Sequence, residues 1–182
     1  MTQKRPQTTE YAPYYGTYVM LVPEGDFLEI LEAQSREMQE LLAPVGERQA
    51  DFRYAPDKWS IKEILGHIND AERIFSYRML RIARGDDTPL PGFEQDDYVK
   101  TANSSGQKLS ALLEEFVAIR RSTLALVHSL ESSAWLRHGT ASGKPVSVLA
   151  LGFIIAGHVI HHQRILAQRY LPALEAAGAS VP

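Results

Sequence analysis

Hydrophobic positions recur every three or four residues in four long segments of this chain, and polar residues fill most of the positions between them. The four segments span roughly residues 26–42, 59–84, 107–130 and 146–171. This spacing places the apolar residues of each segment on one face of an α-helix. No segment shows a two-residue alternation flanked by turn residues, so we predict no β-sheet. The pattern predicts an all-α protein, with a four-helix bundle as the first choice of architecture.

Local signals mark the ends of two of these helices. Ser60 and Glu63 have the spacing of a capping box, in which the two side chains satisfy free backbone N–H groups at the start of a helix. Gly85 follows the same segment and is suited to end it. Ser147 is a candidate cap for the fourth helix, which we expect to end before Pro172 because proline lacks the N–H group of a helical hydrogen bond.

The first 23 residues carry no helical period. They contain prolines, one glycine and a cluster of tyrosines, namely Tyr11, Tyr14, Tyr15 and Tyr18. We interpret residues 1–23 as an extended arm whose tyrosines pack on the domain or on a partner, with a partly ordered tail as the alternative. Residues 24–182 then form a single bundle domain, since a chain of 182 residues is long enough for one substantial core.

The longest connection joins the second and third helices. Residues 85–106 include a cluster of glycine, aspartate and proline at 85–92. Fully extended, this connection reaches about 70 Å, whereas the second helix is only about 38 Å long. It could therefore run back along the bundle and leave helices two and three parallel. The 43–58 connection could cross as well, so length alone leaves the topology open. A loop of this size is usually functional or packed as a lid.

Composition and charge exclude several classes of function. The chain is 45% hydrophobic and 23% charged, with a net charge of −3 and a pI near 6.1, so no basic field attracts nucleic acid or an anionic membrane. It has no cysteine and hence neither disulfides nor thiolate ligands. The polar start lacks a signal peptide, and the longest apolar run, Val146–Ile160, is too short for a membrane span. We therefore expect a cytoplasmic protein.

Three histidines interrupt the apolar faces of the second and fourth helices. His158 and His162 lie one turn apart in the fourth helix, and His67 lies on the core-facing stripe of the second. Two imidazoles at i and i+4 within a dry stripe can present two ligands to one metal ion. If the two helices are neighbours, all three imidazoles can converge and leave a further position for water, as in catalytic zinc sites.

The alternative is a set of ordinary core histidines. A lone histidine on an apolar face is more often a hydrogen-bonded core residue than a ligand, whereas two imidazoles without partners would be costly to bury. The argument for a metal site therefore depends on the second and fourth helices packing side by side, so that all three histidines meet. His128 and His138 lie outside the stripe, and only His138 could reach the mouth of the pocket.

Other polar residues could assist the three histidines. Asp70 is the preferred partner for the second ring nitrogen of His67, because Glu63 is already committed to the capping box. His161 could orient its neighbours or point into the cavity as a base. The long connection would shape the rim of the pocket with Phe93, Asp96, Asp97 and Tyr98.

Three stretches of the chain resemble the DinB superfamily, including its YfiT-like members. They read WSIKEILGHINDAE at 59–72, DTPLPGF at 87–93 and GHVIHHQ at 157–163. The resemblance covers almost the whole chain, and its most specific parts are the tryptophan-to-histidine spacing and the two histidines four residues apart. It implies a four-helix bundle in up-down-down-up order and a divalent metal held by His67, His158 and His162, with no departure at these positions.

The resemblance also implies a class of activity. Characterised members include thiol-dependent S-transferases and isomerases that use bacillithiol, mycothiol or glutathione, and many members have no known reaction. We therefore expect a metal-dependent enzyme in which Zn²⁺, or else Ni²⁺, Mn²⁺ or Fe²⁺, activates a water or a low-molecular-weight thiol by lowering its pKa. The resulting nucleophile attacks a small electrophile. Since the chain has no cysteine, any thiol would have to come from a cosubstrate.

Three other functions stay open at this stage. A hydrolase would use the same site with water as the nucleophile. A non-catalytic dimeric bundle would hold a structural metal or none. A haem bundle is disfavoured, because neighbouring histidines on one helix cannot supply two opposed axial ligands. The expected partner is a small-molecule substrate, and the tyrosine arm with the exposed apolar rows favours a homodimer.

Overall fold

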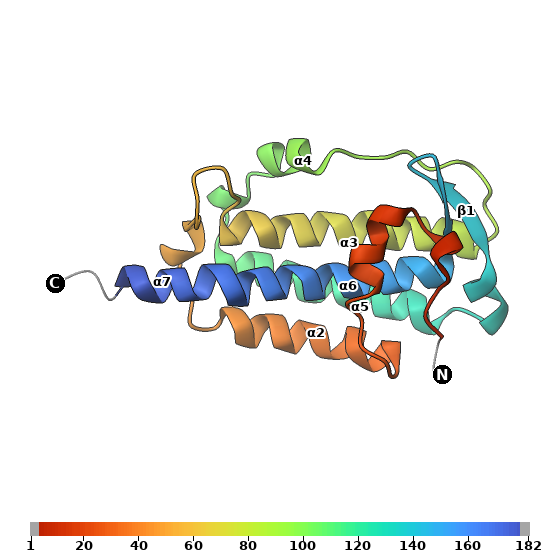
Figure 1. The fold of residues 1–182 in the computed structure, drawn as a ribbon, viewed down its shortest axis with the longest axis horizontal. Helices are drawn as coiled ribbons and strands as arrows, with labels where there is room; N and C mark the ends of the chain where they lie inside the picture. The colour runs from red at the N-terminus through yellow and green to blue at the C-terminus, as the bar shows by residue number, and fades with distance from the viewer. Residues whose placement is uncertain (1–3, 179–182) are drawn as a thin grey trace.

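The structure is a computed structural model that describes residues 4–178, and its long helices form the predicted bundle (Figure 1). These helices are α2 (Phe27–Leu42), α3 (Ile61–Ala83), α5 (Leu109–His128) and α6 (Val148–Ile165). Helices α2 and α6 run in one direction and α3 and α5 in the other, so the order is up-down-down-up. Helix α3 packs against α5 and α6, and α2 contacts the same two helices. The predicted helical bundle and its topology are confirmed.

The residues predicted to start and end the helices do so. The Ser60 hydroxyl accepts a hydrogen bond from the N–H of Glu63 at 3.2 Å, and the Glu63 carboxylate accepts one from the N–H of Ser60 at 2.8 Å. The Ser147 hydroxyl accepts a bond from the N–H of Ala150 at 2.9 Å. After α3, Gly85 has a φ of +80°, a left-handed conformation that glycine adopts without strain.

The prediction that the fourth helix ends before Pro172 is wrong. A π-helical turn, Leu166–Tyr170, follows α6 and leads directly into α7 (Leu171–Gly178). In this wide turn the N–H of Leu171 donates to the carbonyl of Leu166, five residues back. Pro172 follows in the first turn of α7, and the changed hydrogen-bond spacing before it lets the helical path continue without its N–H group.

The prediction of no β-strand is also wrong. Two four-residue strands, β1 (His138–Ala141) and β2 (Lys144–Ser147), form an antiparallel hairpin ahead of α6. The two turn residues, Ser142 and Gly143, both have positive φ values, 53° and 70°, as a tight hairpin turn requires. Four residues hold too few positions for alternation to stand out, so the pattern left this hairpin undetected.

The connection between α3 and α5, here called the crossover (residues 85–108), runs along the outside of the bundle (Figure 1). It contains α4 (Gln95–Thr101) and a 3₁₀ turn, Ser104–Gly106. Near its start, the N–H of Leu90 donates to the carbonyl of Thr140 in β1 at 2.9 Å. Near its end, Ser104 packs so closely on α3 that a Cβ at Gly66 would lie 2.2 Å from the Ser104 hydroxyl oxygen. The crossover is therefore fixed at both ends.

The N-terminal arm lies against the bundle and contains several short turns. It holds the 3₁₀ turns Thr8–Glu10 and Pro13–Tyr15 and the four-residue helix α1 (Gly16–Val19). Elements this short leave no period in a sequence, which is why the pattern indicated only an extended arm. Helix α1 packs on α6 at Gly157, where a Cβ would lie 2.1 Å from the carbonyl oxygen of Tyr18. Arg5 donates hydrogen bonds to the carbonyls of Val19 and Val22 and so holds the arm in place.

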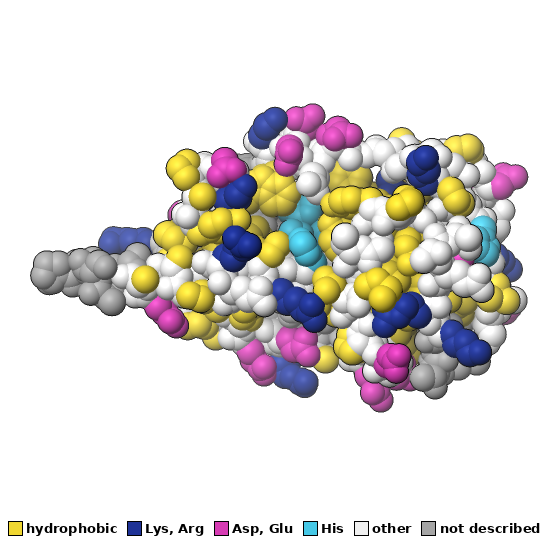
Figure 2. Space-filling model, viewed as in Figure 1, with side chains coloured by type: hydrophobic (Ala, Val, Ile, Leu, Met, Phe, Trp, Pro, Cys, Tyr) yellow, Lys and Arg dark blue, Asp and Glu magenta, His cyan; other side chains and the backbone are white. Residues whose placement is uncertain are grey.

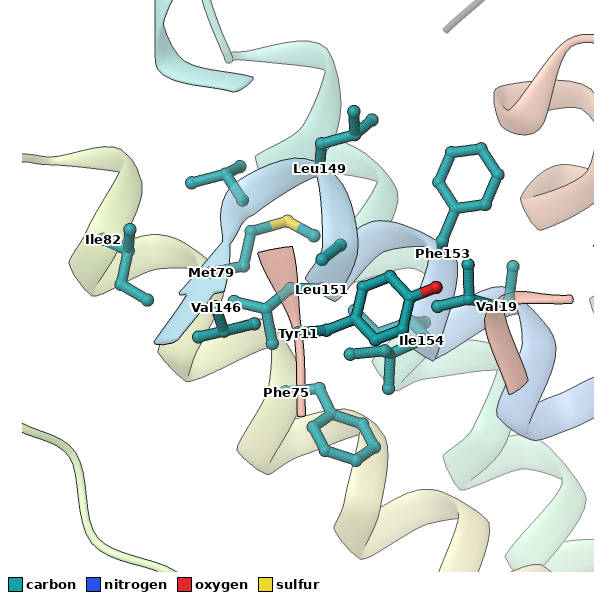
Figure 3. Packing of buried hydrophobic residues seen from close by; sticks show 14 of the residues in the cluster. Tyr11, Val19, Phe75, Met79, Ile82, Val146, Leu149, Leu151, Phe153 and Ile154 are labelled. Carbon is teal, nitrogen blue, oxygen red and sulfur yellow. The ribbon is translucent and has the colours of Figure 1, made fainter. Parts of the chain in front are cut away.

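Two apolar clusters fill the interior. Figure 3 shows part of the first, where Tyr11 and Val19 of the arm join Phe75 and Met79 of α3 and Ile154 of α6. The second cluster lies toward the other end of the bundle, around Met38, Leu65 and Phe116. Two further 3₁₀ turns in the connections are Gln49–Asp51 and Ser132–Leu136.

Most residues of helix α6 are buried. By length and composition the continuous helical stretch Val148–Ala176 could cross a membrane, but 67% of its most apolar window is buried inside the protein. The apolar character of this stretch is therefore accounted for by its place in the bundle.

Candidate metal centre

A layer of buried polar side chains lies between the two apolar clusters. Every long helix contributes to it, and its members include Gln34 (α2), His67 and Glu72 (α3), Arg120 (α5), and His158 and His162 (α6). On each helix these residues fall in the sequence between members of the first cluster and members of the second. The polar layer is thus a cross-section through the middle of the bundle.

Arg120 ties this layer together. Its Nε and Nη2 atoms donate to the two carboxylate oxygens of Glu72 at 2.7 and 2.8 Å. Its Nη1 donates to the carbonyl of Leu31 at 2.8 Å and to Oε1 of Gln34 at 2.6 Å. Gln34 in turn donates to the carbonyl of Ala156 at 2.8 Å. The network pairs both buried charges and joins all four helices at the level of the histidines.

His67, His158 and His162 converge in this layer. Nε2 of His158 lies 3.0 Å from Nε2 of His67 and 3.1 Å from Nε2 of His162. Each residue offers a ligand nitrogen within 4.8 Å of the other two, and the three side chains are only 4–6% exposed. The structure therefore brings together the three histidines that the sequence predicts as metal ligands.

Local structure explains how these side chains meet. The spacing of four residues places His158 and His162 one turn apart on the same face of α6, and α3 carries His67 on the neighbouring helix. Aromatic rings enclose the imidazoles. The Trp59 ring lies 4.8 Å from that of His67, and the Tyr18 ring stands edge-on to that of His158 at 5.2 Å between centroids. These rings restrict the rotation of the two imidazoles.

Burial keeps the three histidines neutral. Loss of solvent lowers the pKa of His67 to about 4 and lowers the pKa values of His158 and His162 well below the ordinary value. The neighbouring imidazoles add to the lowering of the pKa of His158 and His162, because positive rings this close would repel one another. A neutral imidazole has one ring nitrogen with a free lone pair, which is the form that binds metal.

The donor set fits a divalent cation better than it fits a hydrogen-bonded cluster. A neutral imidazole nitrogen either carries a proton or accepts one, so Nε2 of His158 cannot donate to one neighbour and accept from the other. A cation would satisfy all three lone pairs at once. Tetrahedral zinc with nitrogens at about 2.0–2.1 Å places them about 3.4 Å apart, close to the two separations of 3.0 and 3.1 Å.

The carboxylates expected to support the histidines lie elsewhere. Asp70 forms an ion pair with Arg73 at 3.6 Å, and no hydrogen bond within residues 4–178 joins it to any of the three histidines. Glu63 serves the capping box and pairs with Arg53 at 2.5 and 2.7 Å. Nδ1 of His162 is buried without a hydrogen-bond partner. A carboxylate oriented on this ring, common around metal ligands, is therefore missing from the described part of the chain.

The remaining histidines occupy different positions. His161 borders the centre, with its ring 5.0 Å from that of His162 and 5.4 Å from that of Tyr18. It is half-buried, and burial lowers its pKa. His128 and His138 lie outside the centre, each beside a glutamate at 3.4 and 3.8 Å.

Two cavities approach the histidines. The first, called the tyrosine cavity, has a volume of about 340 Å³ and is lined by His67 and His158 with Tyr14, Tyr15, Tyr18, Phe75, Phe93, Glu94 and Asp96. The second, called the tryptophan cavity, has a volume of about 270 Å³ and is lined by His162 with Tyr54, Lys58, Trp59, Asp96 and Tyr170. Figure 2 shows histidine side chains at the bottom of a hollow on the face in view.

The crossover supplies part of both walls. Asp96 of α4 lines both cavities, and Phe93 lines the tyrosine cavity, as the sequence predicts. Tyr98 and Asp97, predicted for the same rim, line neither cavity. Tyr98 packs on the Phe93 ring at 5.2 Å, and Asp97 pairs with Lys100 at 3.1 Å.

Sequence reasoning missed the role of the aromatic residues at the centre. The tyrosine cluster of the arm was visible, but its place beside the histidines depends on the close approach of α1 to Gly157. Trp59 lies before the first residue of α3, so the helical spacing that places His67 does not place the Trp59 side chain. The sequence therefore gave no sign that the two rings pack together.

Comparisons with known proteins identify the family and the fold of this chain. The family model of the DinB superfamily matches residues 30–166. The fold is similar to the solved structure of YfiT from Bacillus subtilis, described as a probable metal-dependent hydrolase with an unusual four-helix bundle topology. The TM-score is 0.74 at 13% identity, over 97% of this chain and 94% of that chain. At this identity the likeness shows the fold alone. No curated protein matches the chain.

Proposed function

Because this chain belongs to the DinB superfamily, we propose that it is an enzyme that binds one divalent metal ion through His67, His158 and His162. The observation that carries the proposal is the convergence of three neutral, buried imidazole nitrogens from two helices. Zinc is the first choice, with Ni²⁺, Mn²⁺ or Fe²⁺ as alternatives, because imidazole suits several first-row ions.

When bound, such an ion would lower the pKa of a water or a thiol and so supply a nucleophile for attack on a small electrophile. The chain's own residues prepare the place for that reaction. The three imidazoles offer lone pairs at neutral pH, and Trp59 and Tyr18 keep two of them from rotating. Residues of the crossover form part of the walls of the two cavities beside the histidines.

Two candidate reactions follow from this site. The description of YfiT supports a hydrolase, whose nucleophile is water. The presence of two cavities beside the three-histidine centre, one at His67 and His158 and the other at His162, supports a transferase, because each cavity could hold one of two reactants. In that case the second reactant would be a low-molecular-weight thiol such as bacillithiol, mycothiol or glutathione, since the chain has no cysteine of its own.

The metal site is tested by elemental analysis of protein purified without an affinity metal column. We expect about one divalent ion per chain in the wild type and almost none in His158→Ala, which removes the central nitrogen of the three. His128→Ala, outside the centre, is the matched control and should keep its metal. Full retention of metal by His158→Ala would contradict the proposed ligand set.

The two reactions are separated by a turnover assay on the metal-loaded protein. A panel of activated esters and small electrophiles is tested with and without added thiol. A transferase should turn over only when thiol is present, whereas a hydrolase should not depend on it. Absence of turnover by fully loaded protein across both arms of the panel would favour a structural metal.

A homodimer remains a further proposal. The arm packs on its own chain, with Tyr11 and Tyr18 only 5% and 6% exposed, so these side chains offer little surface to a partner. Exposed apolar side chains do occur on α3, at Tyr77 and Leu80. Size-exclusion chromatography with light scattering measures the oligomeric state directly.

A further inference from the structure

Aromatic rings wall the tyrosine cavity on several sides. The rings belong to Tyr14, Tyr15 and Tyr18 of the arm, Phe75 of α3 and Phe93 of the crossover. Neighbouring rings stand steeply to one another, at 69° for Tyr14 and Tyr15, 88° for Tyr14 and Tyr18, and 86° for Tyr15 and Phe75. Their centroids lie 5.6–6.0 Å apart. Each of these pairs is an edge-to-face contact, so the rings form one aromatic cluster at the wall of the cavity.

The charges on the cavity wall are all negative. Glu94 and Asp96 line the cavity, and no lysine or arginine does. Within residues 4–178 neither carboxylate takes part in an ion pair, whereas the adjacent Asp97 pairs with Lys100. The cavity therefore combines five aromatic side chains with two carboxylates that have no ion-pair partner among the described residues.

Arg78 shows that these rings can accommodate positive charge. Its guanidinium carbon lies 6.0 Å from the centroid of Phe75 and 5.8 Å from that of Phe93, and the side chain is only 3% exposed. Its hydrogen bonds go to the carbonyl of Pro91 and the hydroxyl of Ser142, and no carboxylate in the described part of the chain forms an ion pair with it. Arg78 does not line the cavity, which leaves the three tyrosine rings for a ligand.

From these walls we infer that the tyrosine cavity binds the ammonium group of a small organic cation, which is the substrate or cosubstrate of the neighbouring metal centre. A cation over an aromatic face is attracted by the negative charge of that face, and the carboxylates add attraction. The volume of about 340 Å³ suits a small molecule. Because His67 and His158 line the same cavity, the rest of such a ligand would lie against the metal-binding nitrogens. The assignment to catalysis rests on the proposed function.

The direct test compares two probes of the same shape and different charge. Choline carries a quaternary ammonium group, and 3,3-dimethylbutan-1-ol replaces that nitrogen with neutral carbon. Binding to the full chain is measured by calorimetry and NMR in the metal-free and the zinc-loaded form. In the metal-free form we expect choline to bind at least about tenfold more tightly than the neutral alcohol. In the loaded form the ion's charge offsets the carboxylates, so a smaller preference is expected.

Matched variants locate the binding. Asp96→Asn and Tyr14→Leu should each weaken choline binding at least about threefold and leave the neutral alcohol unchanged. Tyr14 is 61% exposed, so its replacement should leave the fold intact. Asp97→Asn and Tyr77→Leu are the controls, since neither residue lines the cavity, and both should bind choline as the wild type does.

Equal binding of the two probes, or no measurable choline binding, would overturn the inference. So would an equal effect of Asp96→Asn and Asp97→Asn. Metal content is measured on the same samples to separate this outcome from that of the proposed function. Choline binding by a chain that takes up no zinc would refute the metal site alone. Zinc uptake without choline binding would refute the cation site alone.

Discussion

Three buried imidazoles are the chemically decisive residues of this protein. Their rings are desolvated, neutral and close together, so each metal-free molecule holds lone pairs that its own side chains cannot fully satisfy. Such an arrangement costs stability in the absence of a ligand. Because burial also lowers the pKa values of these histidines, their protonation should change the stability of the folded state with pH.

Metal-free protein should lose stability on acidification. Burial lowers the pKa of His67 from its ordinary value of 6.5 to about 4, so between these values the unfolded chain binds more protons than the folded one. The stability contribution is complete above the unfolded pKa and is lost as the pH falls toward the folded pKa. For His67 alone the loss is about 2 kcal/mol at about pH 5 and approaches about 3 kcal/mol below about pH 4. Urea unfolding of chelator-treated protein between about pH 7.5 and about pH 5 measures it.

His67→Phe, which keeps an aromatic ring and removes the titrating group, is the control for this measurement. Its stability should fall less steeply with decreasing pH than that of the wild type. An unfolding midpoint of the wild type that does not change with pH would contradict a buried neutral His67.

Gly157 is decisive for a steric reason. A Cβ at this position would lie 2.1 Å from the carbonyl oxygen of Tyr18, which is backbone and cannot rotate away. Gly157→Ala should therefore displace the arm and destabilise the protein by about 1–3 kcal/mol. Urea unfolding measures the stability, and trypsin cleavage after Arg5 measures release of the arm. Gly16→Ala is the matched control, because its Cβ would meet only an ordinary contact at 3.8 Å. Equal behaviour of the two variants would contradict this account.

At the scale of the elements, one buried network fixes how the helices meet. Arg120 and Glu72 are 1% and 2% exposed, and together with Gln34 their hydrogen bonds link all four long helices. The hydrophobic pattern did not predict this network, because it assigns core positions to apolar residues and charged residues to the surface. The histidines depend on it, since it sets the relative position of α3 and α6 in the same layer.

Breaking this pair should be costly. Glu72→Gln leaves a buried guanidinium without its counter-charge, and we expect a loss of about 3–5 kcal/mol in unfolding free energy. The double variant Arg120→Met, Glu72→Leu should cost less than the sum of its single changes, because no charge is left unpaired. Glu40→Gln, in an exposed pair with Arg36 at 3.8 Å, should have little effect. A strictly additive double variant would show that the two residues are independent.

Long elements were predicted well and short ones poorly. The boundaries of α2 and α3 follow from helical periodicity over many residues and from caps such as Ser60. The hairpin β1–β2, helix α1 and the π-helical turn before Pro172 each span only four or five residues per element. Elements this short have no period to detect, and tertiary packing rather than local preference stabilises them.

At the scale of the whole molecule, a bound metal should act as a cross-link between α3 and α6. Protein loaded with zinc at about a thousand times the dissociation constant should gain about 4 kcal/mol, which raises Tm by about 8–16 °C for a chain of this size. Differential scanning calorimetry with and without chelator measures the shift. His162→Ala should show almost no metal-dependent shift, and an unchanged wild-type Tm would contradict binding of an ion between the two helices.

The sequence by itself determined the four helices, their caps and the faces on which the histidines lie, because these depend on residues within a turn of one another. Resemblance to a family supplied the topology, which the lengths of the connections had left open, and it supported the ligand set that the helical spacing of the histidines had suggested. Only the tertiary structure decided that His67 and His158, 91 positions apart, meet at 3.0 Å. It also decided that Asp70 turns away to Arg73 and that the arm and crossover enclose the centre. Such contacts join distant parts of the chain, so their geometry depends on how the whole bundle packs and not on any local pattern.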